Sequence, residues 1–275
     1  MTVLCRVMEV STSAYYDWVK QPETTEKAME IKRLETKTRQ LFDEFKQTYG
    51  SRRLADELQK AGFNCGRYQT KNLMKRMGLR VRYPRKFKNT TDSNHNDAIS
   101  PNSLNRNFDI AEPNKVWTTD ITYVWTLEGW MYVAIVMDLF SRQIVGWAID
   151  DHMRTSLCTS ALQMAFWRRK PPPGLLHHSD RGSQYASEDY RKHLRIMRME
   201  QSMSRKGNCW DNAPTERFFR SLKHEQLNYE KFRTKEAAKL SVIDYVAFYN
   251  GQRAHSKLGY QSPIIFERAF YNKVA

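Results

Sequence analysis

The spacing of apolar residues near the start of the chain predicts helices separated by short turns. Residues 1–20 contain two short stretches of helical spacing on either side of a turn rich in serine and threonine. Residues 24–47 predict one long amphipathic helix, because Ile31, Leu34 and Leu41 recur along one side. The first pair of helices has the form of a helix-turn-helix, and two roles stay open for it, contact with DNA or packing alone.

A second pair of helices is expected between residues 49 and 88. The first helix covers 52–60, the glycine-containing segment 61–64 breaks it, and the second helix covers 68–77 and stops at Gly78. The second helix is the stronger candidate for a recognition helix that enters a DNA groove. The N-terminal part of the chain is therefore expected to be an all-α helix-turn-helix region.

The pattern becomes strand-like after a polar segment at 89–113, which is expected to be a linker. β-branched and aromatic residues dominate 116–124, and two further strands with tight turns between them are expected over 130–138 and 143–149. The later elements are a helix at 155–169, a strand that leads to residue 180, a helix at 187–195, a strand near 201–203, a helix that contains residue 216 and an amphipathic helix at 235–250. This order predicts an α/β core with a mixed five-stranded sheet.

The charge of the chain points to its partner. The 45 lysines and arginines exceed the 30 acidic residues and give a net charge of +15, and such an excess is a statement about partners rather than fold. Between residues 67 and 88 there are nine basic residues and no acidic residue, whereas a solvated face usually mixes both signs. We expect this run to contact DNA phosphates, chiefly through Lys71, Lys75, Arg76 and Arg80.

The cysteines and the apolar runs indicate in which cellular compartment the protein is expected. The four cysteines are scattered without a C-x-x-C pair, which argues against both a zinc module and a disulfide framework. The longest apolar run, 130–137, is far too short to span a bilayer. A cytoplasmic protein with no membrane partner is therefore expected.

Three acidic residues stand where a pair of metal ions could be bound. Asp120 lies in the middle of a predicted strand, Asp180 ends a short strand before a glycine-containing loop, and Glu216 lies near the start of a helix. Taken singly, such residues are more often strand-edge or turn residues. Two-metal phosphoryl transfer needs several carboxylates that converge on one pocket. We therefore expect all three to be catalytic and to bind two Mg²⁺ ions, for which Mn²⁺ can substitute.

The helix that carries Glu216 has polar groups along one face. Asn212 lies four residues before Glu216, and Arg220 and Lys223 lie four and seven residues after it, so all four recur on the same side of an α-helix. We expect Asn212 to support the site, and Arg220 and Lys223 to hold DNA phosphates. Lys206, in the preceding loop, is expected to share that role.

The sequence around these acids resembles one protein family. The matching words are Trp-Thr-Thr-Asp-Ile-Thr-Tyr at 117–123, His-Ser-Asp-Arg-Gly-Ser-Gln-Tyr at 178–185, Asp-Asn-Ala-Pro-Thr-Glu-Arg-Phe-Phe at 211–219 and Arg-Ala-His-Ser-Lys-Leu-Gly-Tyr at 253–260. The 35 residues between Asp180 and Glu216 match the Asp-Asp-35-Glu spacing of DDE transposases and retroviral integrases. The chain most resembles the catalytic second-frame protein (OrfB) of the bacterial insertion-sequence-three family, over nearly its whole length.

The resemblance implies a domain plan and an activity. With the pattern of elements, it gives an N-terminal helical, helix-turn-helix segment at 1–48, a second helix-turn-helix-like DNA-binding domain at 49–88 and the linker at 89–113. The catalytic core that it implies, ribonuclease-H-like and integrase-like, covers 114–234, and a C-terminal helix and tail cover 235–275. The implied enzyme cleaves DNA at the ends of an insertion sequence and joins a 3′ hydroxyl to another phosphodiester, with Mg²⁺. The implied partners are DNA, a first-frame protein (OrfA) or a fusion with it, and further copies of the same chain.

Two other classes remain as rivals at this point. One is a ribonuclease-H-like nuclease that hydrolyses DNA without joining it, because the same acids serve that chemistry. The other is a non-catalytic DNA-binding regulator built on the two helix-turn-helix segments.

Overall fold

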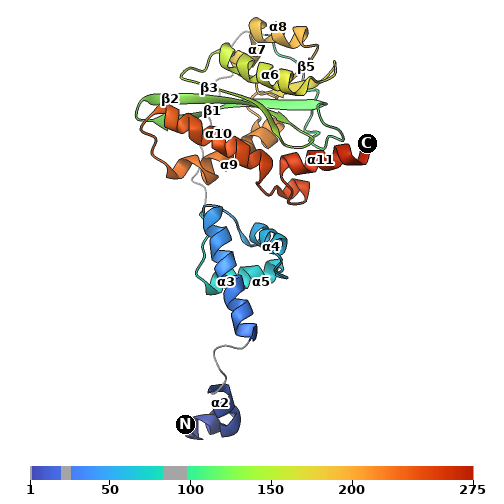
Figure 1. Cartoon of the computed structure of the whole chain (residues 1–275). Helices are drawn as coiled ribbons and strands as arrows, with labels where there is room; N and C mark the ends of the chain where they lie inside the picture. Colours follow the sequence, from blue (N-terminus) through green and yellow to red (C-terminus); the bar gives the residue numbers. More distant parts are fainter. Residues whose placement is uncertain (1, 20–25, 83–97, 275) are drawn as a thin grey trace. The chain divides into compact units, whose positions relative to one another are not determined.

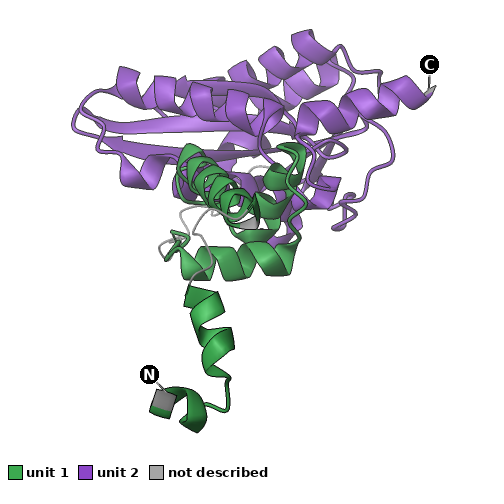
Figure 2. Ribbon diagram, turned by 60° about the horizontal axis from the view of Figure 1, so that its bottom comes forward, with its two compact units in different colours: residues 1–82 green, residues 83–275 purple. Residues whose placement is uncertain are grey.

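The chain forms two compact units, residues 1–82 and 83–275 (Figures 1 and 2). The computed structural model describes residues 2–19, 26–82 and 98–274. The end of the basic run, at 83–88, and the first part of the predicted linker, at 89–97, lie outside the described residues.

The first unit is all-α in its described part. Its helices are α1 (Thr2–Val7), α2 (Thr12–Val19), α3 (Glu26–Glu44), α4 (Ser51–Lys60) and α5 (Arg67–Arg76). The predicted helix pair at 52–60 and 68–77 is therefore confirmed as α4 and α5. Gly78, with φ of +67°, lies just beyond α5, where a left-handed residue ends a helix at little cost when it is glycine.

Apolar side chains hold α3, α4 and α5 together. Leu54 and Leu58 of α4 are fully buried, and so is Tyr49 in the preceding loop. The ring of Tyr49 stacks on Phe45 with the ring centroids 4.0 Å apart. These contacts give the three helices a core of their own.

The second unit is built on a mixed five-stranded sheet. Its strands are β1 (Val116–Thr126), β2 (Gly129–Asp138), β3 (Ile144–Asp150), β4 (Leu176–Ser179) and β5 (Glu200–Met203), in the order β3-β2-β1-β4-β5. The first three strands form an antiparallel meander, and β4 and β5 run parallel to β1. The predicted α/β core with a mixed five-stranded sheet is confirmed.

Helices cover both faces of this sheet (Figure 1). One side has α6 (Thr155–Arg169), α7 (Ser183–Ala186) and α8 (Glu188–Ile196), and the other has α9 (Ala213–Glu225) and α10 (Lys235–Gly251). Successive residues of a strand point to opposite faces, so Ala134 packs toward α6 and Val133 packs toward α9 and α10. Gly146 of β3 lies so close to α6 that a Cβ atom there would be 2.3 Å from the carbonyl oxygen of Ala161.

The later part of the segment that was expected to be a linker packs on the sheet. Leu104 is buried against Val116 and Leu139. The backbone N–H of Leu104 donates to the Ser202 hydroxyl at 3.2 Å. Residues 98–113 therefore extend the core, because a buried leucine and a satisfied backbone group hold them to it.

The C-terminal part also packs on the core. A further helix, α11 (Pro263–Val274), was not expected from the sequence, and the single 3₁₀ turns η1 (Cys209–Asn212), η2 (Leu227–Tyr229) and η3 (Ser256–Leu258) complete the described part of the unit. The side chain of Asn250 accepts from the N–H of Ile144 and donates to its carbonyl oxygen, both at 2.9 Å. The C-terminal part of the unit therefore packs on the core.

In the parts of the chain that the structure describes, no helix is both long enough and apolar enough to cross a membrane.

Candidate active site

The register of two neighbouring strands brings Asp120 and Asp180 to the same level of the sheet. β1 and β4 run parallel, and Thr118 lies beside His178. Two residues further along the same register, half-buried Asp120 is level with Asp180, which directly follows the end of β4. Because adjacent strands are about 4.8 Å apart, two carboxylates that are distant in sequence become neighbours.

The loop after β4 orients one oxygen of Asp180. Its Oδ1 accepts a hydrogen bond from the backbone N–H of Gly182 at 2.9 Å. A Cβ atom at position 182 would lie 3.1 Å from that same oxygen, so glycine leaves room for the carboxylate. The guanidinium of Arg181 donates to the carbonyl oxygen of Ser204 at 2.6 Å and ties the loop to the chain beyond β5.

The first turn of α9 is bonded to the strand that carries Asp120. Thr215 donates its hydroxyl proton to the hydroxyl of Thr118 at 2.7 Å. Asn212 donates from its amide to the carbonyl oxygen of Thr119 at 3.0 Å, and all four of these residues are buried. Because these two strand residues directly precede the aspartate and Glu216 directly follows Thr215, the bonds place Glu216 beside the strand.

The three carboxylates are close enough to interact electrostatically. Burial raises the pKa of Asp120 well above its usual range, and the charges of Asp180 and Glu216 raise it further. Partial desolvation and the charge of Asp180 also raise the pKa of Glu216, although its side chain remains accessible to solvent. Carboxylates held together in this way need protons or a cation to offset their repulsion. Carboxylate oxygens are the ligands that Mg²⁺ prefers, so the donor set fits a hard divalent cation.

Lys223 lies beside the same acids. Its Nζ is 4.4 Å from the centre of the Tyr123 ring, and its positive charge lowers the pKa of Asp120. Burial lowers the pKa of Lys223 itself to about 8, against the opposing effect of Asp120. Arg220 and Lys206, which were also predicted to hold DNA, are exposed to solvent.

A buried carboxylate that the sequence analysis did not select anchors the loop before α9. Asp211 accepts hydrogen bonds from the guanidinium of Arg205 at 2.7 and 2.9 Å, from that of Arg106 at 2.7 Å and from the amide of Asn102 at 3.0 Å. The Arg205 guanidinium holds the pKa of this carboxyl well below its usual range. The Asp-Asn pair at 211–212, at the start of the helix motif, was the sequence signal for this carboxylate. Its partners Arg106 and Asn102 lie more than 100 residues away, and sequence pattern does not show such contacts.

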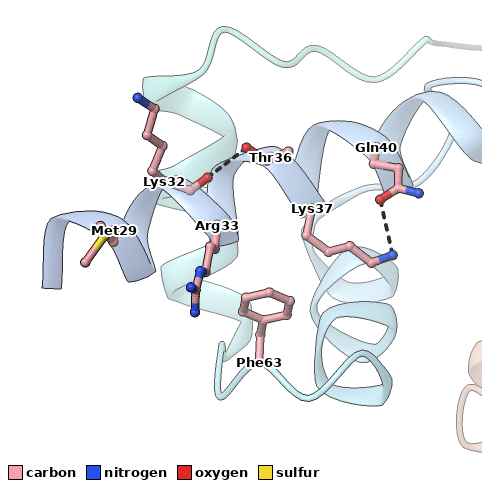
Figure 3. Close-up of a pocket in the computed structure, with 7 residues that line it drawn as sticks. All are labelled: Met29, Lys32, Arg33, Thr36, Lys37, Gln40 and Phe63. Carbon is pink, nitrogen blue, oxygen red and sulfur yellow. Dashed lines mark hydrogen bonds between the residues drawn. The ribbon is translucent and has the colours of Figure 1, made fainter. Parts of the chain in front are cut away.

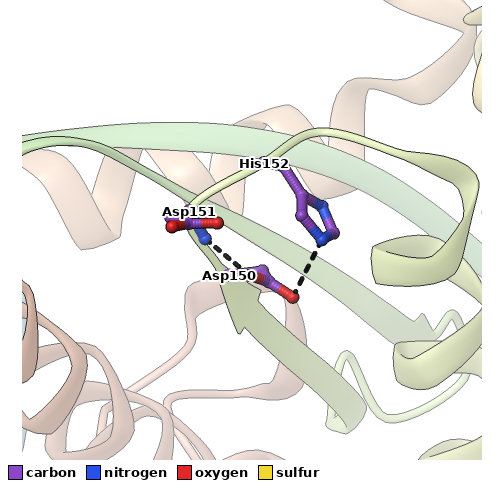
Figure 4. Close-up of side chains that lie close together, drawn as sticks. All are labelled: Asp150, Asp151 and His152. Carbon is purple, nitrogen blue, oxygen red and sulfur yellow. Dashed lines mark hydrogen bonds and ion pairs between the residues drawn. The ribbon is translucent and has the colours of Figure 1, made fainter.

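Within the described residues, one group of three side chains has candidate metal-binding atoms all within 4.8 Å of one another, and it is not the predicted triad. Asp150, Asp151 and His152 lie at the end of β3 (Figure 4), with Nε2 of His152 3.4 Å from Oδ2 of Asp150. Both aspartates are exposed, as acidic groups without a metal commonly are. Oδ1 of Asp150 accepts from the N–H of Asp151 at 2.7 Å, which stabilises the turn. The oxygens of the predicted triad are spread more widely.

In the first unit, the residues predicted to contact DNA lie on α5 and just after it. Lys71, Lys75 and Arg80 are exposed. Arg76 is also exposed, but its guanidinium forms an ion pair with Glu35 of α3 at 2.6 Å. Part of its charge is therefore already offset within the unit.

A groove of about 600 Å³ beside α3 offers three cations that the sequence analysis did not select. Lys32, Arg33 and Lys37 line the groove together with Phe63, which projects from the loop after α4 (Figure 3). Nζ of Lys37 is held at 3.3 Å from Oε1 of Gln40. Cations beside a half-buried ring can contact a nucleic-acid backbone and a base.

Comparison with known proteins defines the class. Family models of the integrase core domain match residues 111–209 and 197–263, and the model of an HTH-like domain matches residues 30–87. The fold is similar to that of a chain in the simian T-cell lymphotropic virus intasome, with a TM-score of 0.51 and 14% identity over 84% of this chain and 74% of that chain. The fold and the acidic site therefore define an integrase-core protein with a helix-turn-helix-like domain.

The curated relatives narrow this class to a family. The chain is 42% identical over 273 residues to the 31 kDa protein of insertion element IS600 from Shigella sonnei, covering 99% of this chain and 100% of that protein. It is 39% identical over 266 residues to the transposase InsF for insertion sequence IS3A from Escherichia coli strain K12, covering 96% and 92%. The chain belongs to the insertion-sequence-three (IS3) family of transposases. The resemblance seen in its sequence motifs is confirmed, and so is the integrase-like, ribonuclease-H-like fold.

Proposed function

We propose that this transposase cleaves DNA at the ends of an insertion sequence and joins the 3′ hydroxyl to another phosphodiester, with two divalent cations held by Asp120, Asp180 and Glu216. The observation that carries the proposal is geometric. The register of β1 and β4 sets Asp120 level with Asp180, and the bond of Thr215 to Thr118 brings Glu216 of α9 to the same strand. The charges of Asp180 and Glu216 accordingly raise the pKa of Asp120. A set of like charges in a folded protein is stabilised when a cation binds between them.

Each residue of the site has a proposed part in this chemistry. Asp120 and Asp180 would hold the metal from adjacent strands and Glu216 from the first turn of α9. Bound Mg²⁺, or Mn²⁺ in its place, would activate a nucleophile at neutral pH and stabilise the charge on the leaving oxygen. Asn212 keeps α9 against β1 through its bond to the Thr119 carbonyl group, so it would support the site without touching DNA.

Lys223 is the residue proposed to hold a DNA phosphate next to the one under attack. Seven residues after Glu216, it returns to the same side of α9, about 10 Å along the axis. Its charge already acts on Asp120. Lys223→Ala should therefore lose joining through poor DNA positioning while metal binding is retained, and Lys223→Arg should keep most function. Joining by Lys223→Ala at the wild-type level with subsaturating DNA would exclude this role.

The more distant DNA contacts and the partners are also proposals. Arg220 and Lys206 on the catalytic unit, and the basic residues of α5 on the first unit, would hold the flanking duplex. The net charge of +15 supports DNA as the main partner. A first-frame protein (OrfA) would add recognition of the element ends, copies of the chain would assemble on DNA, and the complex would act on nucleoid DNA in the bacterial cytoplasm.

One gel assay separates the proposed transposase from its two rivals. Asp120→Asn, Asp180→Asn and Glu216→Gln keep the side-chain shape but remove a metal ligand, so each should abolish cleavage and joining of labelled element ends in Mg²⁺ and keep the DNA shift. Wild-type protein should give joined products. Nicks without joining would indicate the hydrolytic nuclease, and shifts alone would indicate the regulator.

Asp150→Asn is the matched control for these variants. It removes an exposed carboxylate from the cluster at the end of β3 and should leave joining at the wild-type level. Titration calorimetry with Mn²⁺ should show lost binding in Glu216→Gln and unchanged binding in Asp150→Asn. The opposite pattern would place the metal at the end of β3 and overturn the proposed site.

A further inference from the structure

Two exposed tryptophans and a half-buried tyrosine form an aromatic group that the proposed chemistry does not use. Trp125 of β1 lies opposite Trp130 of β2 in the antiparallel register, with the ring centroids 4.7 Å apart. Tyr123 meets the Trp130 ring edge to face at 5.1 Å. Trp125 is 56% exposed and Trp130 is 46% exposed. We call Tyr123, Trp125 and Trp130 the aromatic strip.

A single lysine connects the aromatic strip to the acidic site. Nζ of Lys223 lies 4.4 Å from the centre of the Tyr123 ring, and the same charge acts on Asp120. Tyr123 and Trp125 follow Asp120 by three and five residues, about 10 and 17 Å along β1, and these odd offsets point their side chains to the face opposite that of Asp120. Lys223 is the residue that reaches both. A DNA strand whose phosphate is held by Lys223 would therefore have its next bases within reach of the strip.

The turn that carries the strip is held in place. The N–H of Leu127 donates to the carbonyl oxygen of Phe232 at 3.0 Å. The carboxylate of Glu128 accepts from the N–H of Lys235 at 2.7 Å. The end of the β1–β2 hairpin is thus bonded to the chain just before α10 and at its start. A surface that is already ordered loses little conformational entropy when a ligand binds.

Scattered exposed aromatic residues are ordinary on a protein surface, but this group differs in two ways. The rings contact one another, and the cation of Lys223, which adjoins the acids, lies against the ring of Tyr123. Rings next to a cation are the combination that binds unpaired nucleotides, because every base has a face that stacks. On the basis of the proposed strand transfer, we propose that the aromatic strip stacks unpaired bases of the DNA strand that leaves the acidic site.

The test compares two DNA probes with the full-length chain in Ca²⁺, where no chemistry is required. One probe is a fluorescein-labelled duplex with a 3′ thymidine overhang, and the other is the same duplex with blunt ends. Wild-type protein should prefer the overhang. The preference should fall on the order of 10-fold in Trp125→Ala and in Trp130→Ala, since stacking contributes about 1–3 kcal/mol per base. The salt dependence should not change, because the basic residues that bind phosphates are all retained.

Two variants serve as controls. Trp125→Phe keeps a ring and should keep most of the preference. Trp167 is 68% exposed on α6, and Arg169, two residues further on, bonds Asn114 just before the start of β1. Trp167 therefore lies near the opposite end of β1 from the strip, and Trp167→Ala should bind both probes as the wild type does.

Several results would overturn the aromatic strip as a stacking site. They are no overhang preference in the wild type, an equal loss on the blunt duplex, or an equal effect of Trp167→Ala. Dissociation of a wild-type oligomer by Trp125→Ala in sedimentation would instead assign the strip to a protein interface. Joining in Mg²⁺ tests the proposed function separately. Joining without overhang preference refutes the strip alone, and overhang preference without joining refutes the strand transfer alone.

Discussion

Replacing Arg253 with alanine should strongly destabilise the second unit. The guanidinium of Arg253 donates to both carboxylate oxygens of Glu225 at 2.6 Å and to the Ser221 hydroxyl at 3.1 Å. The hydroxyl of Tyr245 donates to the same carboxylate at 2.8 Å. The two charged side chains are only 5% and 7% exposed. The pair joins the chain after α10 to the helix that carries Glu216.

The expected size follows from this burial. Alanine would leave the Glu225 carboxylate buried without its cation, and breaking a buried pair in this way costs about 3–5 kcal/mol. That loss is between about a fifth and the whole of a typical folding free energy of about 5–15 kcal/mol. Arg253→Lys should cost less than alanine, because it keeps the charge but not the two-pronged geometry. Arg253→Met combined with Glu225→Met should also cost less than Arg253→Ala, because it leaves no buried charge.

Urea unfolding followed by tryptophan fluorescence measures this loss. Six of the seven tryptophans lie in the second unit, and only Trp18 lies in the first. With a slope of about 2 kcal/mol per molar urea, Arg253→Ala should lower the unfolding midpoint by about 2 M. A midpoint within about 0.3 M of the wild type would refute the reasoning. The reasoning would also be refuted if Arg253→Met combined with Glu225→Met lost more unfolding free energy than the two single substitutions lose when their losses are added.

Three further changes test separate features of the structure. Gly146→Ala forces β3 and α6 apart and should cost about 1–3 kcal/mol, whereas Gly251→Ala, which has open space around its Cβ, should be near neutral in the same measurement. The pKa of Asp211 is lowered in the folded protein, so its stabilisation is present above the unfolded pKa of about 3.9 and is lost as the pH falls through the folded value. The difference in unfolding free energy between the wild type and Asp211→Asn should therefore be full at pH 7 and shrink below pH 4. A difference that does not depend on pH would contradict this role of Asp211. Neutralising Lys71 and Lys75 together should lower the log–log salt slope of duplex binding by about 0.9 for each phosphate that the protein no longer binds, and an unchanged slope would show that both face solvent only.

Local pattern was sufficient for the kinds of element and their order. β-branched and aromatic residues around Asp120 predicted β1, and the helical spacing at 155–169 predicted α6, which begins and ends at those residues. Each of these predictions depends only on residues a few positions apart. The three acids and the family could likewise be identified from short sequence motifs alone. The helix α11 was missed, and residues 98–113 were taken for a linker, because neither segment has a strong pattern of its own.

The tertiary structure alone decided which residues meet. Pairing of β1 with β4 sets Asp120 level with Asp180, and the bond between Thr215 and Thr118 brings α9 to that strand. The partners of Asp211, the buried Arg253–Glu225 pair and the contact of Lys223 with Tyr123 likewise join segments that are distant in sequence. Such contacts depend on strand register and on which helix face is buried, and both are set by the packing of the whole unit. The sequence by itself therefore determined the residue types that the chemistry needs, and packing determined that they lie together.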